Sequence, residues 1–236
     1  MTTASERPVM LVTGARTGIG RHLAERFASR GFAVTGCSRE PSDLAVDGYT
    51  HVTADVADEK QVVSLLGDIG RRFGRLDAAV NSAGIASMNH VLTTPGATAE
   101  RIVRTNFLGT FLICREAAKL MMKAKRGRIV NVSSVAVPLM LEGEAAYAAS
   151  KSAVETFTRI LAHELGPFGI TVNAVGPPPI ATDLTRGVPK EKIDALVARL
   201  ALRRPGTVEE VGRLVEFLVA PETDYLTGQT IYLGGP

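Results

Sequence analysis

The chain has 236 residues, of which 45% are hydrophobic and 22% are charged, and its formal net charge at pH 7 is +3. This length and hydrophobic content suit an α/β protein with a sizeable core, and we expect a single domain over residues 1–236. The 27 basic and 24 acidic residues are interspersed, apart from one basic cluster at residues 123–128. Because nucleic-acid binding usually needs a basic stripe or patch, we expect no nucleic-acid partner.

The cysteines, the histidines and the first residues argue against a disulfide-rich, a metal-binding and a secreted protein. Cys37 and Cys114 do not resemble a disulfide framework, and the four histidines show no metal-ligand spacing. We therefore expect no metal site and a reducing compartment. The chain begins without a signal-peptide pattern, and no apolar run approaches the roughly 18 residues of a membrane-spanning helix. These features predict a cytoplasmic protein with no membrane partner.

Strand and helix patterns alternate along the chain. Residues 9–12 predict a buried strand, which a glycine-containing turn at 13–20 joins to a helix ending near residue 30. Further strands are expected at 33–38, 50–54, 78–81, 128–133, 170–175 and 229–233. Helices are expected at 61–73, 99–123, 145–165 and 208–219, with a charged segment at 190–200. This order predicts an α/β fold, a Rossmann-like doubly wound parallel sheet of about seven strands with a ligand site at their carboxyl ends.

The helix expected at 145–165 carries a candidate chemical pair. Its apolar positions recur at helical spacing and predict one buried face: Val154, Phe157, Ile160, Leu161 and Leu165. Tyr147 and Lys151 are four residues apart, so they project from one face about one turn apart, on another part of the surface. We expect the Lys151 cation to lower the pKa of the Tyr147 phenol, which would suit the phenol to proton transfer near neutral pH. The alternative is a packed ring beside a solvated charge.

The turn at 13–20 carries three glycines after a strand and before a helix. This pattern allows a tight turn, close approach of a pyrophosphate and anion binding at the helix N-terminus. The second strand ends at Ser38 and Arg39, where an enzyme that selects NAD usually carries a carboxylate. Arg39 and Arg16 are suited instead to a 2′-phosphate, which favours NADP(H). The alternative is that both arginines are solvated at loop ends.

Five motifs, in this order, resemble those of the short-chain dehydrogenase/reductases, and the resemblance spans nearly the whole chain. They are T-G-x-x-x-G-I-G at 13–20, D-V at 55–56, N-x-A-G at 81–84, V-N-V-S-S at 130–134 and Y-x-x-x-K at 147–151. The resemblance implies four catalytic residues: Asn106, Ser134, Tyr147 and Lys151. Tyr147 would donate a proton to a substrate carbonyl and Ser134 would hydrogen-bond its oxygen. Lys151 would bind the nicotinamide ribose, and Asn106 would hold a water that relays protons to Lys151.

The same resemblance implies NADP(H) as the cofactor. The residues that would bind it are Gly14, Arg16, Thr17, Gly18, Ile19, Gly20, Ser38, Arg39, Asp55, Val56, Asn81, Ala83, Gly84, Tyr147, Lys151, Pro177, Ile180 and Thr182. One segment departs from the family pattern, because Gly176-Pro177-Pro178-Pro179 stands where a P-G pair is usual. Each proline removes an N–H donor, so contacts to the cofactor amide are expected to be fewer. Residues 184–200 are expected to form a mobile lid over the substrate.

Within the family, the chain most resembles 3-oxoacyl carrier-protein reductases, through MMKAKRGRIVNVSS, GITVNAV and TGQTIYLGG. The resemblance implies a carrier-bound β-ketoacyl thioester as substrate and an acyl carrier protein as a possible partner. The basic cluster would steer that acidic partner, although Phe168 stands where an arginine is frequent. Alternatively, the cluster only solvates a helix end. The competing functions are reduction of a free ketone, oxidation of a sugar or secondary alcohol, and a non-catalytic dinucleotide-binding module.

The two longest expected helices, at 99–123 and 145–165, carry apolar residues beyond one core-facing stripe. Such residues need cover in a folded protein, and related proteins pair these helices between subunits. We therefore expect a homotetramer, or otherwise a homodimer.

Overall fold

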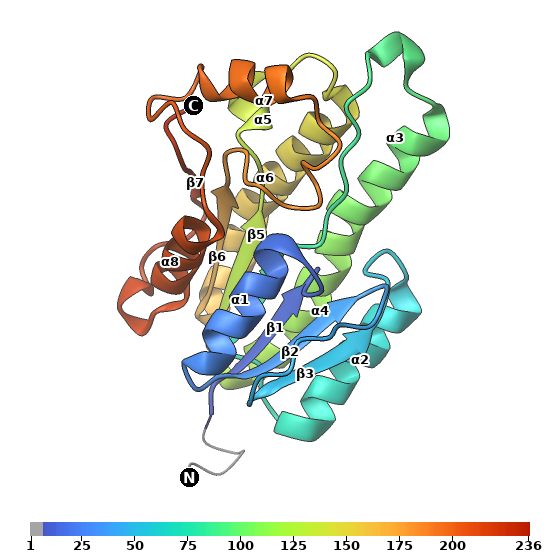
Figure 1. Ribbon diagram of the computed structural model, residues 1–236. Helices are drawn as coiled ribbons and strands as arrows, with labels where there is room; N and C mark the ends of the chain where they lie inside the picture. Colours follow the sequence, from blue (N-terminus) through green and yellow to red (C-terminus); the bar gives the residue numbers. More distant parts are fainter. Residues whose placement is uncertain (1–6) are drawn as a thin grey trace.

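One seven-stranded parallel sheet runs through residues 7–236, the part of the chain that the computed structural model describes (Figure 1). Its strand order is β3-β2-β1-β4-β5-β6-β7, and every neighbouring pair is parallel. The strands are β1 (Val9–Thr13), β2 (Ala33–Ser38), β3 (Tyr49–Thr53), β4 (Ala78–Asn81), β5 (Gly127–Val132), β6 (Ile170–Gly176) and β7 (Thr230–Tyr232). The expected Rossmann-like, doubly wound fold is confirmed. Residues 1–6 of the expected domain lie outside the described residues.

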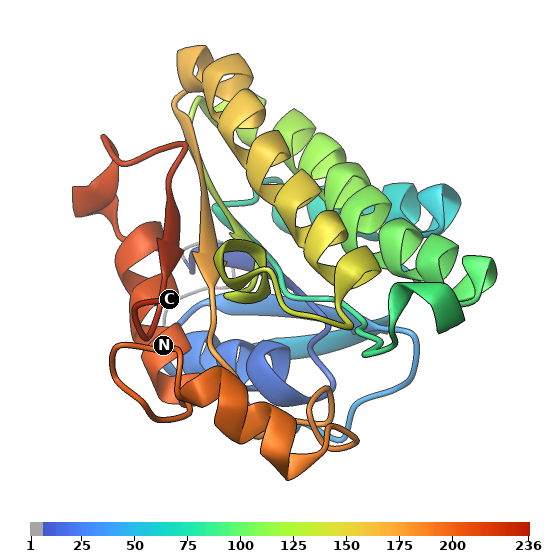
Figure 2. The ribbon, with the colours of Figure 1, turned by 90° about the horizontal axis from the view of Figure 1, so that it is seen from above.

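Helices cover both faces of this sheet, as Figure 2 shows from above. One face carries α1 (Gly18–Ser29) and α8 (Val208–Val219), and the other carries α2 (Glu59–Phe73), α4 (Gly109–Ala124) and α6 (Ala145–Leu165). The shorter helices are η1 (Val91–Thr93), α3 (Gly96–Val103), η2 (Arg104–Leu108), α5 (Ala136–Leu139), η3 (Gly166–Phe168), α7 (Lys190–Val197) and η4 (Pro221–Thr223). The sequence patterns did not predict α5 or the short η segments other than η2.

β1 shows why the apolar runs form central strands. All five of its residues are buried. Val9 and Leu11 belong to the core beneath α2, α4 and α6, whereas Met10 and Val12 belong to the core beneath α1 and α8. Successive side chains of a strand point to opposite faces, so a strand covered on both faces must be apolar throughout.

Local signals set where the helices begin and end. The Asp58 side chain accepts hydrogen bonds from the backbone N–H groups of Lys60 and Gln61, at 2.9 and 3.1 Å. It therefore caps α2, which begins two residues earlier than the apolar pattern predicts. Gly74, with φ of 68°, ends the same helix in the left-handed conformation that glycine adopts easily.

The segment expected as one helix at 99–123 is in fact three elements. Between α3 and α4 the backbone forms a π-helical turn at Arg104–Leu108, and Asn106 lies inside it, fully buried. Periodicity does not reveal such a turn, because one extra residue shifts the apolar pattern only slightly. Turns of this kind occur frequently at functional sites.

α6 has the expected bounds, and Val154, Leu161 and Leu165 are buried as expected, but the rest of its buried face differs. Tyr147 and Lys151 are buried rather than on the surface, at 8% and 4% exposure, and Ile160 is 52% exposed rather than buried. Phe157 is only partly buried and packs against Phe107 and Phe111, with ring centroids 6.0 and 5.6 Å apart. The buried face therefore runs along the whole helix, from Tyr147 to Leu165, while part of the apolar surface lies outside.

Candidate active site

A cleft of about 660 Å³ opens at the carboxyl ends of the strands, where the doubly wound fold predicts a ligand site. Residues that directly follow β1, β2, β4, β5 and β6 line it, together with α7. The predicted site residues that line the cleft are Gly14, Arg16, Thr17, Gly18, Ile19, Gly20, Ser38, Arg39, Asp55, Val56, Ala83, Gly84, Ser134, Tyr147, Lys151, Pro177, Ile180 and Thr182. Asn81 and Asn106 are predicted site residues that lie elsewhere.

The glycine turn fits a dinucleotide pyrophosphate. A Cβ on Gly20 would lie 2.3 Å from the Gly14 carbonyl oxygen, and Gly14 and Gly18 have positive φ angles of 69° and 56°. Only glycine satisfies these demands without strain. Thr17 occupies the N-cap of α1 without a side-chain capping hydrogen bond. The backbone N–H groups at the start of this helix therefore remain available to a phosphate.

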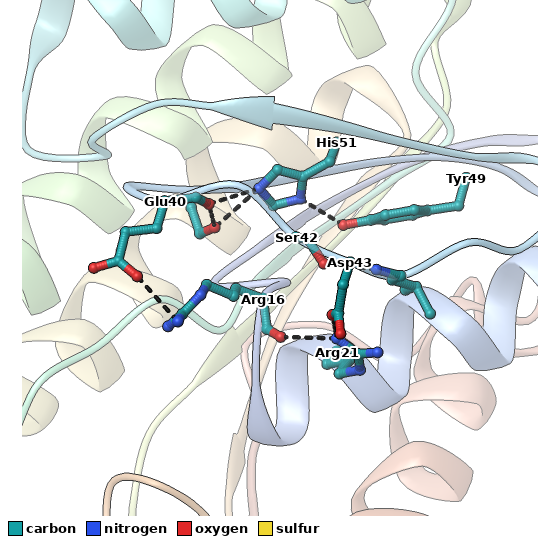
Figure 3. Close-up of polar contacts among 9 residues, drawn as sticks. Arg16, Arg21, Glu40, Ser42, Asp43, Tyr49 and His51 are labelled. Atoms are coloured by element: carbon teal, nitrogen blue, oxygen red, sulfur yellow. Dashed lines mark hydrogen bonds and ion pairs between the residues drawn. The ribbon is translucent and has the colours of Figure 1, made fainter.

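The adenosine end of the cleft lies at the turn after β2. Ser38 is half-buried, whereas Arg39 is exposed and forms no ion pair within residues 7–236. Arg16 pairs with Glu40, at 3.0 Å between Nη2 and Oε2 (Figure 3). The sequence motifs do not include Glu40, which lies two residues past the end of β2. Asp55 uses its Oδ1 to accept a hydrogen bond from the Ala57 N–H at 2.9 Å, which shapes the neighbouring wall.

The catalytic candidates come together at the carboxyl end of β5. Lys151 Nζ donates to the Val132 carbonyl oxygen at 2.7 Å and lies 5.9 Å from the centroid of the Tyr147 ring. Ser134, which directly follows Ser133 at the strand end, accepts a hydrogen bond from the Ala136 N–H at 3.1 Å. The three side chains therefore share one small part of the cleft.

The electrostatics of this group differ from the expectation. Burial raises the pKa of Tyr147 to about 12, while interaction with Ser134 acts in the opposite direction. The prediction that Lys151 lowers the pKa of this phenol is wrong for the protein without cofactor. Burial also lowers the pKa of Lys151 to about 8. Tyr147 therefore holds its proton at neutral pH, as a proton donor must.

Asn106 is near this group but is committed elsewhere. Its Oδ1 accepts from the Ile85 N–H and its Nδ2 donates to the Ile85 carbonyl oxygen, both at 2.9 Å. Nδ2 also donates to Ser150 Oγ at 3.0 Å. A Cβ on Gly84 would lie 3.4 Å from both Asn106 Oδ1 and Lys151 Nζ. Asn106 thus fixes the wall beside Lys151, and its side chain does not line the cleft.

Asn81 lies inside the protein. Its Nδ2 donates to Asn131 Oδ1 at 2.9 Å and contacts Cys114 Sγ at 3.2 Å. The Asn81 side chain is therefore engaged inside the protein and does not line the cleft. The neighbouring Ala83 and Gly84 do line the cleft.

The proline segment after β6 is buried and uses its carbonyl groups. Pro177 accepts from the Val135 N–H at 3.1 Å, and Pro179 accepts from the Gly206 N–H at 3.0 Å. Thr182, two residues after the short bridge at Ile180, packs against the glycine turn, since a Cβ on Gly18 would be 3.3 Å from its side chain. The segment thus links the loop after β5 with the glycine turn, and its prolines restrict the backbone between them.

Residues 7–236 do not meet the requirements of a membrane-spanning helix, a metal site or a reactive thiol. None of their helices combines the length and the apolarity needed to cross a bilayer. They contain no group of three or more His, Cys, Asp or Glu side chains suited to a metal ion. Cys37 and Cys114 are buried free thiols, and burial raises the pKa of each to about 12. Neither thiol is poised as a nucleophile.

A family model described as Enoyl-(Acyl carrier protein) reductase matches residues 14–235. The chain belongs to the short-chain dehydrogenase/reductases, a family of oxidoreductases. The 3-oxoacyl-[acyl-carrier-protein] reductase FabG of Vibrio cholerae is 35% identical to it, over 98% of this chain and 97% of the relative. FabG of Staphylococcus aureus is 34% identical, over 95% and 96%. The resemblance found in the sequence motifs is therefore confirmed.

Two solved structures of this fold are similar along almost their whole length. Thermoplasma acidophilum aldohexose dehydrogenase, in ligand-free form, superposes with a TM-score of 0.88 and 31% identity, over 97% of this chain and 93% of that one. ElxO with NADP bound superposes with a TM-score of 0.88 and 29% identity, over 96% and 97%. The two neighbours carry different names on one fold, so the fold alone does not choose the substrate.

The substrate end of this short-chain dehydrogenase/reductase contains a carboxyl group that the motifs do not include. Glu144 lies three residues before Tyr147 and lines the cleft. Burial raises the pKa of its carboxyl group, and the charge of Lys192 on α7 opposes that shift. Apolar side chains from α7 and from the loop after α5 complete the wall: Leu141, Ile193 and Leu196.

The basic cluster lies at the amino ends of the strands, whereas the cleft lies at their carboxyl ends. α4 ends at Ala124, directly before β5 begins at Gly127, so the cluster surrounds the amino end of that strand. Arg128 is buried, Arg126 lies 3.5 Å from Asp77, and Phe168 packs against the core. Steering of a carrier protein by this cluster stays a prediction, and within one chain the cluster and the cleft lie at opposite ends of the strands.

Proposed function

We propose that this single-domain protein uses NADPH to reduce a ketone to a secondary alcohol, with a β-ketoacyl thioester as substrate. The observation that carries the proposal is the meeting of Ser134, Tyr147 and Lys151 in the cleft that also contains the glycine turn. The identity to 3-oxoacyl-[acyl-carrier-protein] reductases along nearly the whole chain supports the substrate class. A non-catalytic module would have no use for this buried group.

Each side chain has a defined part in the reaction. When bound, the cofactor supplies hydride to the carbonyl carbon. Tyr147, which holds its proton well above neutral pH, donates that proton to the carbonyl oxygen. Ser134 donates a hydrogen bond to the same oxygen as negative charge develops. Lys151 provides a cation beside Tyr147 and binds the nicotinamide ribose. Asn106 holds the wall beside Lys151, and a relay water would lie next to it.

NADP(H) is the proposed cofactor because the turn after β2 offers a hydroxyl and a cation at the adenosine ribose. Ser38 and Arg39 line this end of the cleft. Arg39 is exposed and unpaired within the described residues, so it can contact a 2′-phosphate without breaking an ion pair. The structural neighbour ElxO, solved with NADP bound, supports this assignment.

The proposed assembly is a homotetramer, with a homodimer as its smallest form, in which α4 and α6 pair between chains. The exposed apolar side chains on α3, η2 and α6 support it: Val103, Leu108 and Ile160. A two-fold axis across these helices would bring the amino ends of the strands of one chain toward the cleft of the other chain. The basic cluster at 123–128 would then guide an acidic carrier protein to the partner's cleft.

A free polar substrate, such as a sugar, is the second candidate. Glu144 supports it, because a carboxylate at the substrate end can accept hydrogen bonds from substrate hydroxyl groups. Aldohexose dehydrogenase, whose fold superposes closely, has a name that fits this class. The alternative is weaker because Leu141, Ile193 and Leu196 make much of that wall apolar.

The proposal is tested by following NADPH absorbance with three substrate sets. β-Ketoacyl thioesters and simple ketones are assayed for NADPH consumption, and aldoses are assayed as donors with NADP for NADPH formation. We expect the thioesters to give the highest kcat/KM. Turnover restricted to aldoses would transfer the assignment to the second candidate. Failure of every set, with NADPH still bound, would contradict a reductase of carbonyl compounds.

A further inference from the structure

A hydrogen-bonded histidine on β3 lies behind the turn that follows β2. His51 is half-buried, and its Nε2 is 3.0 Å from Ser38 Oγ and 3.0 Å from the Glu40 carbonyl oxygen. Its Nδ1 is 2.7 Å from the Tyr49 hydroxyl. Figure 3 shows the imidazole between Tyr49 and Glu40. Ser38, the last residue of β2, and the turn residues Arg39 and Glu40 line the cleft, so His51 would act on a bound molecule through them.

The contacts decide which ring nitrogen carries the proton. A carbonyl oxygen only accepts hydrogen bonds, so Nε2, at 3.0 Å from the Glu40 oxygen, is the protonated nitrogen of the neutral ring. Nδ1 is then the acceptor, and the Tyr49 hydroxyl donates to it. Burial raises the pKa of Tyr49, which keeps this donor proton in place. The Ser38 hydroxyl also donates to the Glu40 oxygen, at 2.6 Å, so this oxygen has two donors.

The double contact allows Ser38 to change partners. The Ser38 hydroxyl has one hydrogen to donate. Its hydrogen bond to the Glu40 carbonyl oxygen must therefore break before it can donate to a phosphate oxygen. A carbonyl group left without a donor would make that exchange unfavourable. The Nε2–H of His51 stays on the carbonyl oxygen and removes this obstacle.

We propose that His51 is a positioning residue for the 2′-phosphate of NADP(H). Its Nε2–H holds the Glu40 carbonyl group and releases the Ser38 hydroxyl to donate to the phosphate. The same contact fixes the backbone of Glu40, whose carboxylate is paired with Arg16 and so opposes the phosphate less. This inference rests on the proposed 2′-phosphate site at Ser38 and Arg39.

The test is direct binding of NADPH and of NADH, followed by cofactor fluorescence, to the wild type, His51→Phe and His51→Gln. Phenylalanine keeps a ring on β3 but removes both nitrogens, whereas glutamine keeps an N–H near the position of Nε2. We expect His51→Phe to weaken NADPH binding by about threefold to tenfold, the effect of one hydrogen bond, and to change NADH binding by less than about twofold. His51→Gln should bind NADPH nearly as the wild type does. His163→Phe, on the exposed side of α6, is the matched control and should change neither affinity.

Two results would overturn the proposal. Equal weakening of NADPH and NADH in His51→Phe would show that the ring only supports the turn, and unchanged NADPH binding would show that it does not act on Ser38. A wild type that binds NADPH and NADH equally would show that the proposed 2′-phosphate site does not exist. That result differs from a failure of the His51 proposal alone, in which the wild type still prefers NADPH. If His51→Phe does not fold, Tyr49→Phe replaces it, with an expected loss of about twofold to threefold for NADPH only.

Discussion

Arg39 has the strongest expected influence on cofactor choice. It follows β2 directly and is unpaired within residues 7–236, whereas Arg16 is already paired with Glu40. A charge-assisted contact contributes about 1.5 to 3 kcal/mol, so Arg39→Ala should lower kcat/KM for NADPH by about ten- to hundredfold. Arg16→Ala should cost less, and Ser38→Asp should favour NADH because its carboxylate repels the phosphate.

The measurement is kcat/KM for NADPH and for NADH in the wild type and these three variants. NADH lacks the 2′-phosphate and should respond little to Arg39→Ala. Equal losses with both cofactors would identify Arg39 as a residue that supports the turn and does not bind phosphate.

Lys151 gives the expected pH dependence. Its pKa of about 8 lies below the ordinary value of 10.5, so the folded protein loses this cation as pH rises through about 8. We expect kcat/KM for NADPH, which reports the free enzyme, to fall above that pH. For Lys151 alone, the free energy of unfolding should rise between pH 8 and 10.5, because only the unfolded chain binds its proton there. A rate profile that stays flat to the alkaline side of this window would contradict the assignment.

Sequence motifs locate Ser134, Tyr147 and Lys151, because the chemistry requires these residue types at a fixed spacing. They do not locate Glu40 and Glu144, which reach the cleft through a turn and through a helix N-cap. Nor do motifs reveal burial. Without cofactor, the prediction for the pKa of Tyr147 failed because loss of solvent around the phenol raises it and the charge of Glu144 adds to the rise.

At the level of elements, Glu155 connects α6 with β5 and β7. Its buried Oε1 accepts from Ser133 Oγ at 2.5 Å and from the Tyr232 hydroxyl at 2.6 Å. Burial and then Glu155 itself raise the pKa of Tyr232, which keeps this hydroxyl a donor. Glu155→Ala would leave both hydroxyls without their acceptor.

We expect Glu155→Ala to lower the free energy of unfolding by about 2 to 4 kcal/mol, and Glu155→Gln, which keeps one acceptor oxygen, by about 1 kcal/mol. Urea denaturation measures both values. Turnover should fall as well, because Ser133 precedes Ser134, the proposed donor to the substrate oxygen. Unchanged denaturation midpoints in the alanine variant would show that the contact contributes no stability.

The alternating apolar patterns predict every strand of the sheet to within about two residues, because buried parallel strands require apolar side chains on both faces. Elements that depend on contacts between distant parts of the chain are harder to predict from the sequence. The π-helical turn around Asn106 and the short α5 have no periodic signature, and the exposure of Ile160 depends on where α6 meets its neighbours.

At the scale of the whole molecule, the outer surface of α6 predicts association. Light scattering at micromolar concentration should give about four times, or at least twice, the 25.0 kDa chain mass. Ile160→Glu places a charge on this surface and should lower the mass. Leu202→Glu, at a residue that is 61% exposed away from α6, is the control and should not. A wild type of monomer mass would contradict the proposed assembly.

The central claim is that Tyr147 donates the proton in an NADPH-dependent carbonyl reduction. Its most direct test is single-turnover oxidation of bound NADPH by a β-ketoacyl thioester in the wild type and in Tyr147→Phe, with NADPH affinity measured in parallel. The variant removes one hydroxyl and keeps the buried ring. We expect its rate to fall by a factor of about a thousand or more, within the range for loss of a positioned proton donor, while NADPH binds as before. A near-normal rate in Tyr147→Phe would contradict the account.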